Sequence, residues 1–321
     1  MRPAYLAFFL VSATTAATPV AMRQGDEVTL PNTEIRTLRS EFVDQEFRLM
    51  IARPFQPPAP PATTYPVVYL LDADTSFPLA RQVALSLESG FELPPVLIVG
   101  IGYAGGFAEG ALRRNRDYTP TPDPIFTKFA ARLGASPPGE GAYGGAGAFL
   151  RFLREELKPF IEERFPADPA DATLFGVSFG GLFATYTLLH EPDTFQRYII
   201  GSPSLWWDDQ VVFEYEARYA DQHDDLQARV FIAAGGHETA EHDEAQLSKL
   251  PAAMRRPMLE FQEAMHGRVQ MVEVIEPFVD ALRGRSYANL DLTLHIFPGE
   301  THGSVPPMTI SRGLRTVFGT L

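Results

Sequence analysis

The clearest candidate for chemistry in the sequence is one short segment, Gly176-Val177-Ser178-Phe179-Gly180-Gly181. It fits the pattern G-x-S-x-G, in which a sharp strand-to-helix turn exposes the hydroxyl of a serine. An apolar strand, Leu174-Phe175, comes directly before it, and an apolar helical stretch, Leu182–Leu189, directly after it. The segment therefore predicts that Ser178 is a nucleophile. The backbone N–H of Phe179, at the start of the following helix, is predicted to donate to an oxyanion.

A serine hydroxyl needs a general base, and histidine is the usual one. His302 lies in the loop that follows the last predicted strand, residues 290–297, where a base would face the turn of Ser178. His295, inside that strand, is its main rival. Three further histidines are expected to be solvated or structural: His190, His223 and His266.

The carboxylate that orients the base should follow the penultimate strand, Val230–Ala234. Glu238 is the first acid after the turn that ends this strand, and we choose it. Asp243, or a Ser–His dyad without a fixed acid, are the alternatives. His237 and His242 nearby suggest zinc. Their spacing of five does not put both on one helix face, however, and no third ligand is evident, so we expect no metal and no cofactor.

A second oxyanion donor should come from the loop after the strand Val67–Leu71. The N–H of Ala73 or of Asp74 is the candidate. Asp72 and Asp74 could also cap a helix that begins near Phe77, and the two roles are compatible.

The elements that must position these residues alternate between strand and helix from residue 67 onward. Short continuous apolar runs, typical of parallel strands buried on both faces, occur at 67–71, 96–100, 174–177, 198–200, 230–234 and 290–297. Helical patterns lie between or after them, at 77–87, 149–165, 182–189, 247–282 and 308–318. A loosely alternating hairpin, 28–53, precedes them. This order predicts one α/β domain over residues 25–321, with a mostly parallel sheet, an N-terminal antiparallel hairpin and helices on both faces. Insertions near 103–147 and 239–285 are expected to form walls or a lid of the site.

Composition excludes several functional classes. The 321 residues are 45% hydrophobic and contain no cysteine, which excludes a disordered chain, thiolate metal sites and cysteine nucleophiles. With 27 basic against 40 acidic residues the formal net charge is −13, so nucleic-acid binding is not expected.

The first residues favour export. Arg2, a short apolar run and Thr15-Ala16-Ala17 resemble a secretory signal peptide over residues 1–17, which predicts a periplasmic or secreted protein. The run is shorter than the ~20 residues needed to span a bilayer, so stable membrane insertion is not expected.

Several segments together are specific enough to indicate a family. The sequence resembles the Putative esterase family of α/β-hydrolases, in particular its branch of siderophore-type esterases. The matching segments, in order, are Tyr69–Asp72, Arg114–Pro120, Gly176–Gly181, Ser202–Trp207 and Gly299–His302. The resemblance implies carboxylic-ester hydrolysis through an acyl-enzyme, with Ser178 as nucleophile and His302 as base. Relatives cleave siderophore lactones, feruloyl or acetyl esters on polysaccharides, and S-formylglutathione. Members of the siderophore branch can lack a clear triad acid.

Four further residues are candidates for substrate binding. Arg114 or Arg116 could hold an anionic or catecholate group, or Arg116 and Asp117 could be a structural pair. Of Trp206 and Trp207, one could line the acyl pocket while the other packs. We therefore expect an exported serine esterase acting on a small-molecule ester, of undetermined oligomeric state. An acyltransferase on the same scaffold and an inactive ligand-binding protein are the alternatives.

Overall fold

The computed structural model of the protein describes residues 29–57, 63–105, 107–124, 126–128, 141–239, 242, 247–252, 255–256, 259–260 and 271–319. The elements below all belong to one compact unit, residues 32–321. The predicted signal peptide, residues 1–17, lies outside the described residues.

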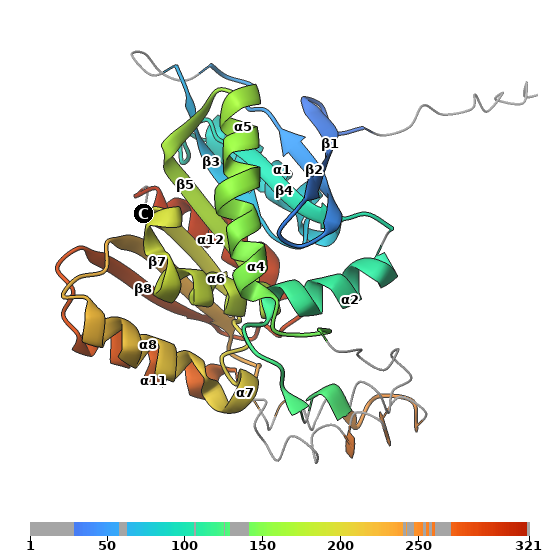
Figure 1. The fold of residues 1–321 in the computed structure, drawn as a ribbon, viewed down its shortest axis with the longest axis vertical. Helices are drawn as coiled ribbons and strands as arrows, with labels where there is room; N and C mark the ends of the chain where they lie inside the picture. The colour runs from blue at the N-terminus through green and yellow to red at the C-terminus, as the bar shows by residue number, and fades with distance from the viewer. Residues whose placement is uncertain are drawn as a thin grey trace, which may run out of the picture. The chain divides into compact units, whose positions relative to one another are not determined.

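Eight strands form one sheet in the order β1-β2-β4-β3-β5-β6-β7-β8 (Figure 1). Their bounds are β1 Thr33–Ser40, β2 Gln45–Ala52, β3 Tyr65–Leu70, β4 Leu97–Tyr103, β5 Ala167–Val177, β6 Arg197–Gly201, β7 Ala228–Gly235 and β8 Leu290–Phe297. The β1–β2 and β2–β4 pairs are antiparallel, and all other neighbours are parallel. The prediction of a mostly parallel α/β sheet led by an antiparallel hairpin is confirmed.

Helices cover both faces of this sheet. Their bounds are α1 Ala73–Ser89, α2 Phe107–Tyr118, α4 Ala146–Arg151, α5 Lys158–Arg164, α6 Phe179–His190, α7 Trp207–Gln210, α8 Val212–Gln222, α11 Val272–Gly284 and α12 Val305–Val317. A π-helical turn, Phe152–Leu157, joins α4 to α5, and a 3-10 turn, Pro192–Thr194, precedes β6. In Figure 1, α1 and α12 lie together behind the sheet, whereas α5, α6 and α8 lie in front of it.

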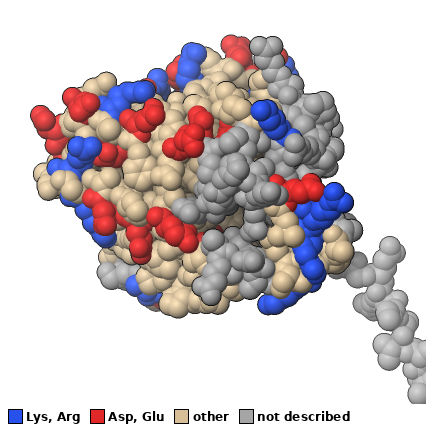
Figure 2. All heavy atoms as spheres, turned by 90° about the horizontal axis from the view of Figure 1, so that it is seen from below, with Lys and Arg blue, Asp and Glu red and all other residues tan. Residues whose placement is uncertain are grey.

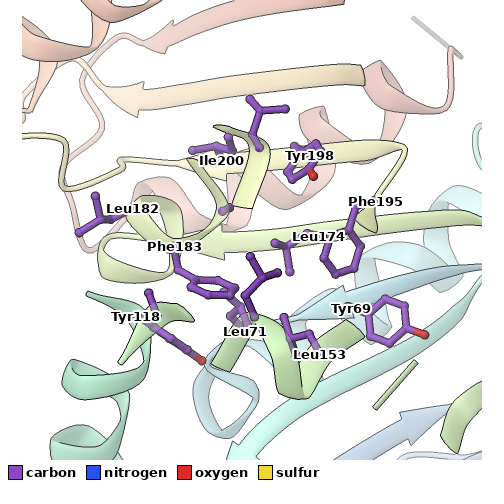
Figure 3. Close-up of a cluster of buried hydrophobic side chains, with 14 of the residues drawn as sticks. Tyr69, Leu71, Tyr118, Leu153, Leu174, Leu182, Phe183, Phe195, Tyr198 and Ile200 are labelled. Carbon is purple, nitrogen blue, oxygen red and sulfur yellow. The ribbon is translucent and has the colours of Figure 1, made fainter. Parts of the chain in front are cut away.

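The core explains this layering. Alternate strand residues point to opposite faces. Leu174 and Tyr198 join Phe183 of α6 in one buried cluster (Figure 3), whereas Phe175 and Ile199 face Ile310 and Leu314 of α12. A strand buried on both faces has no polar alternation, which is why continuous apolar runs identified these strands.

The two predicted insertions are described only in part. The first contains α2, and the second ends in α11; residues 129–140 and 261–270 lie outside the described residues. Among the described helices, none is both long and apolar enough to cross a membrane. On the face drawn in Figure 2, basic side chains are interspersed with acidic ones.

Candidate active site

The turn between β5 and α6 holds Ser178 in an unusual backbone conformation. Its φ of 62° and ψ of −122° are uncommon for a residue with a side chain. A Cβ on Gly176 would lie 2.2 Å from the carbonyl oxygen of Gly180, and one on Gly181 would lie 2.8 Å from that of Gly201. The Ser178 N–H donates to the Gly201 carbonyl at 3.0 Å, which ties the turn to β6. Close backbone approach therefore requires glycine at 176 and 181, whereas a Cβ on Gly180 would make only ordinary contacts, the nearest at 3.5 Å.

Glu238 and His302 are joined by a hydrogen bond. His302 Nδ1 lies 2.7 Å from Glu238 Oε2, and Glu238 Oε1 accepts from the Gly235 N–H at 2.7 Å and from Ser202 Oγ at 2.5 Å. The Glu238 side chain is 3% exposed and that of His302 is 48% exposed. When the Nδ1–H group donates a hydrogen bond to the carboxylate, Nε2 is unprotonated and can accept a proton, as a general base must.

Backbone bonds hold together the loops that carry these two residues. The Gly236 N–H donates to the Phe297 carbonyl at 2.8 Å, and the His237 N–H donates to that of Glu300 at 2.9 Å. A Cβ on Gly235 would lie 2.4 Å from the Glu300 carbonyl oxygen, so this approach needs a glycine.

Sheet order brings the predicted catalytic residues to one edge. Ser178 follows β5, Glu238 follows β7 and His302 follows β8, and these strands run parallel with β6 between β5 and β7. The carboxyl ends of parallel strands share one edge, which is where open α/β sheets place their sites.

The other histidines lie elsewhere. His295 is paired with Ala233 inside the sheet, and burial together with Arg312 lowers its pKa. His190 and His223 end α6 and α8 and bond through Nδ1 to carbonyls of their own helices. Asp243 and His266 lie outside the described residues. The rings of His237 and His242 stack at 4.2 Å. Within the described part of the chain, no three His, Asp or Glu side chains form a group suited to a metal ion.

The helix that supplies the second predicted oxyanion donor begins earlier than expected. α1 starts at Ala73 rather than near Phe77, because Asp72 turns the chain through a left-handed conformation with φ 53°. The Asp72 carbonyl accepts from the N–H groups of Thr75 and Ser76, both at 3.1 Å. The N–H groups of Ala73 and Asp74 belong to the first helical turn, which has no intrahelical acceptors.

The carboxylates of Asp72 and Asp74 do not cap α1. Asp74 accepts from Arg48 at 2.7 Å. The Asp72 carboxylate accepts from Nε and Nη2 of Arg114, at 2.6 and 2.9 Å. Arg114 also donates to the carbonyl of Val177, the residue before Ser178, at 3.3 Å. It thereby links the two turns that carry the predicted oxyanion donors.

Arg114 and Arg116 both bond within the protein. Burial acts to lower the pKa of Arg114, but the adjacent Asp72 carboxylate raises it above its ordinary value. Arg116 donates to Asp117 and to Gln45, each at 2.7 Å. Burial raises the pKa of the Asp117 carboxyl, while Arg116 and Gln45 act in the opposite direction. This second pair orders the chain around α2.

The two tryptophans lie at the start of α7 and belong to an aromatic cluster beside the nucleophile turn. We define this cluster by its members: Phe126, Tyr143, Phe179, Trp206 and Trp207. The Phe179 ring lies 6.2 Å from that of Trp206 and 5.1 Å from that of Trp207. Trp207 is fully buried and donates through Nε1 to the Thr121 carbonyl, whereas the buried Trp206 Nε1 has no hydrogen-bond partner among the described residues.

Two residues at this edge were not predicted as site residues, although both lie in segments that match the family. Ser202, after β6, bonds to Glu238, and Tyr118 Oη accepts from the Asp72 N–H at 3.3 Å. Nothing in a single serine or tyrosine shows that its hydroxyl meets a residue distant in the chain. A cavity of about 280 Å³ lies beside the Asp72–Arg114 pair and is also lined by Tyr103 and Asn115.

Comparison with known proteins indicates the family of this chain. The family model described as Putative esterase matches residues 40–284, which include Ser178 and Glu238. The chain is 32% identical to the ferri-bacillibactin esterase BesA of Bacillus subtilis, over 89% of this chain and 90% of that protein. It is 27% identical to a siderophore triacetylfusarinine C esterase of Aspergillus fumigatus, over 79% and 81% of the two chains.

Solved structures show the same fold. The BES protein from Bacillus cereus, 27% identical, has a TM-score of 0.69 and is covered over 98% of its length by 92% of this chain. The siderophore hydrolase EstB from Aspergillus nidulans, 24% identical, has a TM-score of 0.71, with 91% of this chain and 97% of that one covered. The chain belongs to the Putative esterase family of α/β-hydrolases, in its siderophore-type branch, and is an esterase.

Proposed function

We propose that this protein hydrolyses carboxylic esters through an acyl-enzyme formed on Ser178. His302 Nε2 takes the proton of the serine hydroxyl as Oγ attacks the ester carbonyl, and returns it to the leaving alcohol. Water then attacks the acyl group, with His302 again as base. The observation that carries the proposal is the 2.7 Å bond between Glu238 and His302 at the sheet edge that bears Ser178.

In this mechanism Glu238 holds the imidazole in the required tautomer and stabilises the imidazolium that forms. The N–H groups of Phe179 and of Ala73 or Asp74 receive the charge that develops on the carbonyl oxygen. Arg114 acts on this site by holding Asp72 and the Val177 carbonyl in place.

We propose a siderophore-type ester, or another small acyl or aryl ester, as the substrate. We also propose that the protein is exported and acts in the periplasm or outside the cell. The names of the two curated relatives support the substrate class. We assign Trp206, whose ring lies 6.2 Å from that of Phe179, to the wall of the acyl pocket. We assign Trp207 and Arg116 to packing and loop order, since both bond internally.

The test compares wild type with Ser178→Ala on p-nitrophenyl esters of increasing acyl length, and on ferric catecholate and hydroxamate siderophores that contain ester bonds. Ser89→Ala, on an exposed serine near the end of α1, is the control. We expect hydrolysis by wild type and control and none above background by Ser178→Ala. The acid and alcohol products should form in equal amounts, whereas a new ester would indicate acyl transfer. Turnover that survives in Ser178→Ala would contradict the mechanism.

A further inference from the structure

We propose that Ser202 is a positioning residue of this esterase. Its hydroxyl holds Oε1 of Glu238 in place, so that Oε2 faces His302. The inference rests on the proposed roles of Ser178, Glu238 and His302. It adds a fourth side chain, which acts on the reaction only through Glu238.

The first observation is the contact itself. Ser202 is fully buried, and its Oγ lies 2.5 Å from Glu238 Oε1. The Gly235 N–H donates to the same oxygen at 2.7 Å, and His302 Nδ1 lies 2.7 Å from the other oxygen. Two donors on Oε1 and one on Oε2 leave the carboxylate little freedom to rotate about its last side-chain bond.

The second observation is the charge balance around Glu238. Its side chain is 3% exposed, and no described lysine or arginine lies within ion-pair distance of it. A buried carboxylate is costly unless hydrogen-bond donors stabilise it. The described donors to this carboxylate are the Ser202 hydroxyl, the Gly235 amide and the His302 imidazole N–H. Hydrogen bonds to a charged acceptor are the strong ones, so removal of the hydroxyl should be felt.

The third observation is the backbone of Ser202, whose φ is 36°. Glycine adopts positive φ at little cost, whereas a residue with a Cβ is strained there. Strain of this kind persists where the surrounding structure holds it, and it is common at functional sites. Serine is the smallest residue that supplies a hydroxyl, and at this position the hydroxyl donates to Glu238.

The place of Ser202 in the sheet explains why its side chain meets the acid. The Gly201 carbonyl accepts from the Ser178 N–H at 3.0 Å, and the Ser202 N–H donates to the Ala233 carbonyl at 2.6 Å. This end of β6 therefore lies between the nucleophile turn and the strand of the acid. A variant that alters only the hydroxyl should leave both backbone bonds intact.

The experiment compares Ser202→Ala and Ser202→Gly with Thr187→Val. Thr187 is also fully buried, but its hydroxyl bonds to the Phe183 carbonyl within α6, away from the acid. We expect both Ser202 variants to lose kcat by roughly 10- to 100-fold with little change in KM, because the hydroxyl acts on the transition state. Ser202→Gly also relieves the backbone strain, which offsets part of the lost hydrogen bond, so it should lose less stability in urea than Ser202→Ala. Thr187→Val should retain wild-type kcat.

A double-mutant cycle with Glu238→Ala separates positioning from general damage. If Ser202 acts through Glu238, Ser202→Gly should cost nothing further once Glu238 is alanine. The proton of the His302 Nδ1–H bond should also shift or exchange faster in the NMR spectrum of the free Ser202→Gly enzyme. Equal losses in both backgrounds, or a Ser202→Gly enzyme with wild-type kcat, would overturn the inference.

The two proposals fail differently. Esterase activity in Ser178→Ala would contradict the proposed function whatever the Ser202 variants do. Loss of activity in Ser178→Ala, combined with full activity in Ser202→Gly, would remove only the role of Ser202.

Discussion

Each oxygen of Glu238 has a separate task, and this limits what can replace it. Oε1 accepts from the Ser202 hydroxyl and from the Gly235 N–H, which can only donate, and Oε2 faces His302 Nδ1. A residue at 238 must therefore present acceptors on both sides. Of the acids weighed from the sequence, Glu238 is the one that the structure places beside His302. Asp243 lies outside the described residues.

Glu238→Gln should lower kcat on the order of 10²- to 10⁴-fold with KM little changed. The amide oxygen must take the place of Oε1, which turns the NH₂ group toward Nδ1 and favours the wrong imidazole tautomer. Steady-state kinetics on a short p-nitrophenyl ester measure this. Asp243→Asn is the matched control and should stay near wild type. A full loss in Asp243→Asn with an active Glu238→Gln would reassign the acid.

Among the elements, the strands and the loops that carry the site could be predicted from the sequence, whereas local backbone conformations could not. Apolar runs buried on both faces located β3 to β8, and chain order placed Ser178, Glu238 and His302 after the right strands. The start of α1 was missed because Asp72 takes a left-handed conformation, and its carboxylate bonds to Arg114, 42 residues away. Long-range contacts of this kind leave no local pattern.

The glycines of the β5–α6 turn give a prediction at this scale. Gly176→Ala should lower the free energy of unfolding by about 3 kcal/mol, because its Cβ would overlap the backbone of Gly180. Urea unfolding followed by circular dichroism measures the loss. Gly284→Ala, at the end of α11, has no atom within 4 Å of the added Cβ and should change stability by less than about 1 kcal/mol. Similar values for the two variants would show that the turn is not closely packed.

At the scale of the whole molecule, the sheet separates two helical layers, and the site lies at the edge that both layers share. α1 and α6 belong to opposite layers, yet their first residues carry the two predicted oxyanion donors. The sheet edge can hold these groups in place because each donor begins a helix packed on the core. The lid expected from residues 239–285 lies partly outside the described residues and stays a prediction.

The stability of the molecule should depend on pH through His190, at the end of α6. Its ring stacks on Tyr186 at 4.0 Å and meets Tyr215 edge-on, and burial lowers its pKa below the ordinary 6.5. The unfolded chain then binds more protons than the folded one near that pH. The free energy of unfolding should therefore decline as the pH falls from 6.5 through the folded-state value.

Urea unfolding between pH 7 and pH 5 tests this dependence. His190→Gln should flatten the decline, although His295, whose pKa is also lowered, will retain a share of it. His223→Gln, which removes an exposed histidine stacked on Tyr219, is the control and should keep the decline. An identical pH dependence of the free energy of unfolding in wild type and His190→Gln would show that His190 does not cause the decline.

Acylation of Ser178 during turnover can be measured directly. The enzyme is mixed with p-nitrophenyl acetate, quenched in acid during turnover and analysed by mass spectrometry, intact and after digestion, with Ser178→Ala in parallel. We expect one acetyl group on the wild-type peptide that contains Ser178, and neither this adduct nor turnover in the variant. An acetyl group on another residue in place of Ser178 during turnover, or undiminished turnover in Ser178→Ala, would contradict it.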